Sequence, residues 1–159
     1  MNASDVLKYG HGTVVQTIDR LTDEEWTASG ACGVWSPKDI IAHLASFELV
    51  LIDVLHSLLG DGPTPYLDKF TQQHAEFNDA EVDRRKAQSV ADTLAEYNDA
   101  HAEVMDLIKQ IPAETLRRPG ALSWYGAEYD VEDFLVYTYY GHKREHMGQV
   151  AVFRDRFAR

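Results

Sequence analysis

The chain has 159 residues, of which 45% are hydrophobic, so it is long enough to form one domain with a substantial core. Its formal net charge of −11 at pH 7 argues against nucleic-acid binding, because a negative surface repels the phosphate backbone. Cys32 is the only cysteine, which excludes an intrachain disulfide framework. We see no secretory leader pattern and no apolar run of the roughly 18 residues that a membrane span needs. We therefore expect one cytoplasmic domain over residues 1–159 that does not bind membranes.

The first half of the chain contains two predicted helices. Apolar positions recur at helical spacing over residues 4–20, and Thr22 with the acidic residues after it predicts a short helical turn. A capping serine at Ser36, a proline at the first helical position and an apolar run to Leu59 predict a long second helix. The glycines and prolines of residues 60–65 then end this helix.

The second half predicts two further long helices. Residues 66–84 have an ambiguous pattern, in which we expect a loop with some helix. Ser89 caps a third helix whose apolar stripe continues to Ile111, and Asp130 caps a last helix over residues 131–157. Because neither period-two alternation nor an internal repeat occurs, we expect an all-α fold, a four-helix bundle with a long crossover between helices two and three.

Two histidines four residues apart, His142 and His146, lie in the predicted last helix. Side chains at this spacing project from one helical face about one turn apart, so both imidazoles can reach one ion. Neutral imidazole is a ligand for zinc, nickel, iron or copper. Taken alone, such a pair is more often a surface coincidence or a hydrogen-bonded pair than a metal site.

A third histidine, His43, lies among apolar residues of the second helix and is expected to face inward. A lone histidine in such a place is usually a satisfied core residue. Inward histidines on two helices are costly to desolvate singly, whereas a metal ion between them would make all of them ligands. The pattern therefore points to a metal site formed by His43, His142 and His146, with an unmetallated core as the alternative.

The residues around these histidines resemble two motifs of the DinB/YfiT-like superfamily. Residues 35–48 contain a Trp, a Ser, Lys-Asp-Ile, His-Leu and a Glu five residues after the histidine, which is similar to the second-helix motif. Residues 141–150 resemble the last-helix pattern of two histidines followed by a glutamine, and the order of elements fits over nearly the whole chain. The resemblance implies a helical bundle in which His43, His142 and His146 bind one divalent metal ion.

The same resemblance suggests several activities. The superfamily includes metal-dependent hydrolases, mycothiol- or bacillithiol-dependent transferases and isomerases, such as the N-terminal domain of maleylpyruvate isomerase, and ClbS/DfsB-like proteins, which residues 78–116 resemble. Because these proteins share a scaffold and differ in substrate, the fold does not select among them. The resemblance also leads us to expect a homodimer.

Three histidine ligands would leave an open position for water or for a low-molecular-weight thiol, and a zinc-like ion lowers the pKa of its bound water to about 7. Zinc or nickel is the expected metal, with iron or manganese as alternatives. Gln149 is a candidate to hydrogen-bond a ligand or substrate. Glu48 and Glu145 are candidate acids that orient an imidazole or take a proton. A structural or surface role is an equal alternative for all three.

Four other histidines and several aromatic residues are weaker candidates. His11 and His101 are expected to face the bundle interior, where either would be an extra ligand, whereas His56 and His74 have no partner at ligand spacing. Aromatic side chains could wall a pocket near the metal, although core packing explains most of them as well. These aromatic residues are Trp35, Trp124, Tyr125, Tyr137, Tyr139 and Tyr140.

We carry three functional hypotheses forward. The leading one is a metal-dependent hydrolase or thiol-dependent transferase that acts on a small electrophilic or thiol-conjugated molecule. The alternative is a non-catalytic binding or stress-protection protein with a structural metal, which sequesters a small molecule without turnover. An interaction module without metal would follow if the three histidines failed to converge.

Overall fold

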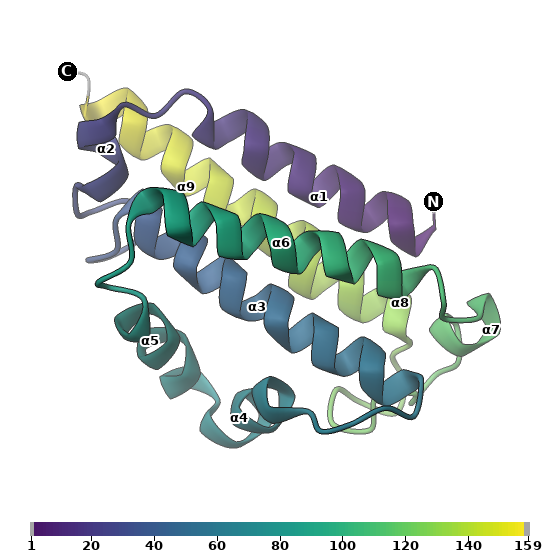
Figure 1. Ribbon diagram of the computed structural model, residues 1–159. Helices are drawn as coiled ribbons and strands as arrows, with labels where there is room; N and C mark the ends of the chain where they lie inside the picture. Colours follow the sequence, from purple (N-terminus) through teal and green to yellow (C-terminus); the bar gives the residue numbers. More distant parts are fainter. Residues whose placement is uncertain (1, 158–159) are drawn as a thin grey trace.

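The computed structural model describes residues 2–157, and it is built from helices (Figure 1). Its four longest helices lie lengthwise beside one another and are α1 (Ala3–Ile18), α3 (Pro37–Leu58), α6 (Val90–Ile108) and α9 (His142–Phe157). Helix α3 packs along α6, and α1 packs against α9 and the segment that precedes it. The predicted all-α fold is confirmed.

Several shorter helices complete the chain. Helices α2 (Asp23–Thr27) and α7 (Ala113–Leu116) lie in connections between the long helices. Before α9, the short helix α8 (Val131–Phe134) continues into a π-helix, η1 (Leu135–Gly141), so that residues 131–157 form one uninterrupted helical segment. The prediction placed a single last helix over these residues and did not include the π-helix.

The ambiguous crossover between α3 and α6 consists of two helices, α4 (Pro65–Gln73) and α5 (Ala75–Arg84), which both lie against α3 (Figure 1). The buried carboxylate of Asp53 on α3 accepts hydrogen bonds from the backbone amides of Tyr66 and Leu67, at 2.7 and 3.0 Å. These amides belong to the first turn of α4, where a carboxylate satisfies N–H groups that have no partner in the helix itself.

A buried arginine attaches the end of the crossover to α6. Arg85 is 4% exposed and donates hydrogen bonds to Glu81 at 2.7 Å and to Glu96 at 2.8 and 2.6 Å. Burial alone would lower the pKa of Arg85, but the hydrogen bonds to Glu96 and Glu81 raise it above its ordinary value. The guanidinium therefore stays charged and holds α5 beside α6.

Helix α3 is the central element of the core. It is long and apolar enough to cross a membrane, which corrects our expectation that no such run exists. However, 83% of its most apolar 18-residue window is buried inside the protein. Its apolar character is therefore explained by packing, because helices cover it on several sides.

Candidate metal centre

The position of His43 in the core is set by the N-terminal cap of α3. The Ser36 side chain accepts a hydrogen bond from the Asp39 amide, and the Asp39 carboxylate accepts one from the Ser36 amide. This capping box and the proline after it fix where the helix begins. His43 follows two turns later and is 2% exposed, with its ring packed against Trp35 and Phe47 at centroid distances of 5.1 and 4.6 Å.

His142 and His146 lie in the first turns of α9, directly after the π-helix η1. A π-helix has wider turns than an α-helix and is often found at functional sites. Gly141 ends η1, where a Cβ atom would come within 3.3 Å of the Val136 carbonyl oxygen. The buried Tyr139 hydroxyl donates a 2.8 Å hydrogen bond to the Phe47 carbonyl oxygen on α3. This bond holds η1 against the helix that carries His43.

The three imidazoles converge, and we call His43, His142 and His146 the histidine cluster. The Nε2 atom of His142 lies 3.1 Å from Nε2 of His43 and 2.9 Å from Nε2 of His146. Zinc–nitrogen bonds of about 2.0–2.1 Å at angles of about 90–110° place ligand nitrogens roughly 2.9–3.4 Å apart. The cluster therefore has the spacing and the donor atoms that could hold one divalent metal ion.

Hydrogen bonds on the outer side of the cluster favour the ligand form of two rings. Nδ1 of His146 lies 2.8 Å from the Gln149 side-chain oxygen, and His142 hydrogen-bonds to the backbone of Thr138. Because each oxygen is an acceptor, these contacts favour rings that carry the proton on the outer nitrogen and a lone pair on Nε2. Two such lone pairs facing each other at 2.9 Å repel unless a cation lies between them.

The cluster is neutral at physiological pH. Burial, together with the nearby His142 and His146, lowers the pKa of His43 from 6.5 to about 2. Burial and His146 lower the pKa of His142 to about 4, although its hydrogen bond with Thr138 opposes the change. Burial also lowers the pKa of His146, against the effect of Gln149. Neutral imidazole is the form that binds metals.

Of the three candidate polar residues, only Gln149 hydrogen-bonds to the cluster, through His146. Glu145 is exposed and lines a hollow together with His142. Glu48 is fully buried and contacts Lys143 and His101 instead of a cluster imidazole. Its partners show that Glu48 belongs to a different part of the core.

That part is a polar layer beside the histidine cluster, to which each of the four long helices contributes. The ammonium of Lys143 and the carboxylate of Glu48 form an ion pair in which the side chains are 2% and 0% exposed. The His101 ring lies 3.5 Å from Glu48 and stacks on the His11 ring at a centroid distance of 3.8 Å. Nδ1 of His11 lies 3.2 Å from the Tyr97 hydroxyl. The polar layer thus comprises His11, Glu48, Tyr97, His101 and Lys143.

The polar layer shows where two of the candidate histidines lie, and it contains one residue that we did not predict from the sequence. His11 and His101 face the interior as expected, but they stack on each other and do not join the histidine cluster. Burial alone would raise the pKa of Glu48, yet Lys143 and His101 lower it below its ordinary value. Lys143 was not among the predicted residues. Its position four residues after Tyr139 and four before Met147, both buried, was the available signal.

The candidate aromatic residues are divided among several places. Trp35 packs on His43, and Tyr137 lines the hollow of about 490 Å³ that contains His142 and Glu145. Trp124 and Tyr125 line a separate pocket, whose wall residue Phe47 also packs on His43 and His142. Tyr139 is buried in the core and Tyr140 packs under Arg144.

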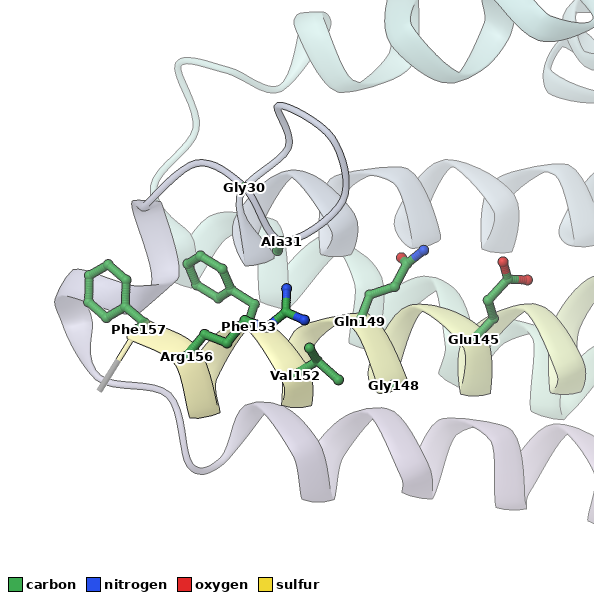
Figure 2. A pocket seen from close by; sticks show the side chains of 9 residues that line it. All are labelled: Gly30, Ala31, Glu145, Gly148, Gln149, Val152, Phe153, Arg156 and Phe157. Atoms are coloured by element: carbon green, nitrogen blue, oxygen red, sulfur yellow. The ribbon is translucent and has the colours of Figure 1, made fainter. Parts of the chain in front are cut away.

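A further hollow, of about 630 Å³, follows α9 away from the cluster (Figure 2). Figure 2 shows Glu145, Gln149 and Phe153 rising from one side of α9, with Phe153 nearest the loop that contains Gly30 and Ala31. Because Gln149 also contacts His146, this side chain connects the hollow with the histidine cluster. The other lining residues are Gly148, Val152, Arg156 and Phe157.

The chain matches one protein family. The family model of the DinB superfamily matches residues 7–150, which include all three histidines of the cluster and the whole polar layer. Neither the curated proteins nor the solved structures contain a significant match.

The lowered pKa values predict how the metal-free protein responds to acid. Unfolding restores ordinary pKa values near 6.5 to His43 and His142, so the unfolded chain binds protons that the folded chain does not. The contribution of these two histidines to the free energy of unfolding is therefore complete above pH 6.5. It decreases as pH falls toward about 4, by roughly 1.4 kcal/mol per pH unit for each histidine. Urea unfolding of chelator-treated protein between pH 7 and 5 measures this slope. The variant His43→Gln should show a shallower slope, and equal slopes would contradict the assignment.

The polar layer predicts strong coupling between Glu48 and Lys143. The variant Lys143→Met leaves a buried carboxylate without its cation, so we expect unfolding free energy to fall by about 3–5 kcal/mol. The double variant Lys143→Met, Glu48→Gln removes both charges and should recover part of that loss. Urea unfolding of the single and double variants tests this. A double variant as unstable as the sum of the single variants would show that the pair is not coupled.

Proposed function

Because the chain belongs to the DinB superfamily, we propose that it is a metal-dependent enzyme that acts on a small molecule through His43, His142 and His146. The observation that carries the proposal is the approach of three neutral imidazoles whose Nε2 atoms face one point. A nitrogen-only donor set favours zinc or nickel, with iron or manganese as alternatives, over the oxygen-seeking magnesium and calcium.

The surrounding residues would supply the remaining chemistry. A divalent ion in this cluster would act as a Lewis acid toward the substrate or toward a water or thiol nucleophile. Gln149 and the Thr138 backbone hold two imidazoles with their lone pairs inward. Phe47 and Trp35 cover His43 and exclude water from that side. Glu145 lines the same hollow as His142, and its carboxylate would take or deliver a proton there.

Two reaction classes fit this arrangement. In hydrolysis, water is the nucleophile, and in thiol-dependent transfer, the nucleophile is a low-molecular-weight thiol. The hollow along α9 supports the second class, because Arg156 and Gln149 could bind the polar groups of a thiol cofactor near His146. A requirement for added thiol distinguishes the two classes.

We also propose that the protein is a cytoplasmic homodimer. The homodimer is what the superfamily resemblance implies, and exposed apolar side chains on the neighbouring helices α1 and α9 are available for such a contact. Those side chains are Tyr9, Val15 and Val152.

Metal content is the direct test of the proposal. Plasma mass spectrometry of untagged protein, purified without nickel resin, should find about one metal ion per chain. Each of His43→Ala, His142→Ala and His146→Ala should lose the metal, whereas the exposed His74→Ala should keep it.

The outcomes separate the functional classes. Metal loss in the three cluster variants justifies a screen of small electrophiles with and without thiols, monitored by mass spectrometry of the products. Bound metal without turnover in that screen would favour the non-catalytic binding protein. No metal in the wild type, and no uptake of zinc, nickel, iron or manganese, would refute the enzyme proposal.

A further inference from the structure

The pocket that Trp124 and Tyr125 line lies beside the histidine cluster and has no part in the chemistry described above. It has a volume of about 500 Å³, which is within the range of small-molecule binding sites. Its walls come from α3, α4, α5 and the loop before α8. We call it the aromatic pocket, and it is lined by Phe47, Phe70, Thr71, His74, Ala75, Asn78, Trp124 and Tyr125.

The rings of the aromatic pocket meet edge to face. Phe70 lies 5.5 Å from Phe47 at an interplanar angle of 79°, and 6.1 Å from Trp124 at 82°. Rings set nearly perpendicular around a cavity offer both edges and faces to a flat guest, which is the preferred geometry of aromatic contacts. Trp124 is 36% exposed and packs on the buried Phe134 at a centroid distance of 5.3 Å, so its indole is partly open to a ligand.

The pocket is lined mainly by neutral side chains. Among the described residues that line it, none is an aspartate, glutamate, lysine or arginine, and His74 contributes the one imidazole. A charged group would therefore lose hydration there without gaining a carboxylate, ammonium or guanidinium partner. The net charge of −11 disfavours anions further. Thr71 and Asn78 offer neutral hydrogen-bonding groups.

One side chain separates the pocket from the histidine cluster. The Phe47 ring packs on His43 and His142, at centroid distances of 4.6 and 4.8 Å, and it also lines the hollow that contains His142. Phe47 is therefore a wall common to the aromatic pocket and to the hollow that contains His142.

The crossover that forms two of the walls is held in place. Asp53 accepts hydrogen bonds from two backbone amides at the start of α4. Arg85, at the end of α5, donates hydrogen bonds to Glu96 on α6. Between them His74 has a φ of 49°, an uncommon backbone conformation for a residue other than glycine. The pocket is thus a largely preformed feature of the fold.

We propose that the aromatic pocket binds an uncharged aromatic group of the substrate, whose reacting end then reaches the histidine cluster. This assignment of the substrate class rests on the proposed function. The binding step itself does not need the metal, because all lining contacts come from the chain.

Binding of 2-naphthol tests the proposal, with 2-naphthoate as the charged analogue of the same ring system. Titration of the metal-free protein, followed by ¹H–¹⁵N NMR, should shift the amides of residues around the aromatic pocket. We expect 2-naphthoate to bind at least about tenfold more weakly, because its carboxylate finds no lysine or arginine in the lining.

Three variants locate the binding site. Trp124→Ala should weaken 2-naphthol binding about threefold to tenfold, whereas Trp124→Phe keeps a ring and should stay close to wild type. Ala75→Arg fills the rim without removing core side chains and should also weaken binding. The control Tyr9→Ala removes an aromatic residue on α1 that is more exposed than Trp124, 56% against 36%, and it should have no effect.

Binding of 2-naphthoate as tight as that of 2-naphthol, or binding unchanged by both Trp124→Ala and Ala75→Arg, would overturn the proposal. Because the titration uses metal-free protein, this result is independent of metal content. A protein that binds 2-naphthol here but takes up no metal would refute only the proposed function.

Discussion

The structure depends on how three neutral imidazoles are accommodated in an apolar core. His43 and His146 are buried and His142 is half-buried, and each ring has one polar nitrogen directed at the cluster, where such groups are costly to desolvate without a partner. Gln149 and the Thr138 backbone hydrogen-bond to His146 and His142 on the outer side, which favours Nε2 lone pairs that face each other in these two rings. A metal ion is the partner that satisfies all three together, and in its absence the cluster is a local source of instability.

The neighbouring elements keep these rings in place. The capping box of Ser36 and Asp39 sets the start of α3, and the Tyr139 hydroxyl fastens η1 to the Phe47 carbonyl. The polar layer then fixes α9 from its inner side, since Lys143 follows His142 directly and pairs with Glu48 on α3. The chain therefore holds the two helices of the cluster together by contacts that do not involve a metal. Such support makes the cluster a prearranged site.

Much of this arrangement could be predicted from local patterns. The all-helical fold followed from helical periodicity and caps, and the approach of His43 to His142 and His146 followed from helical spacing on two inward faces. The crossover was less predictable, because the cap of α4 is supplied by Asp53, which is 12 residues before Pro65 on another helix. Lys143 was missed because a lysine is read as solvated unless its carboxylate partner is known. That partner, Glu48, lies far away in the chain.

The measurement that tests the central claim most directly is a zinc titration of histidine-labelled, metal-free protein, followed by ¹⁵N NMR of the imidazole rings. Before zinc is added, His142 and His146 should carry their protons on Nδ1. At about one equivalent of zinc, the Nε2 signals of His43, His142 and His146 should shift together, while those of His11 and the other histidines stay in place. Zinc that shifts none of the three signals, or that shifts His56 or His74 instead, would contradict the account.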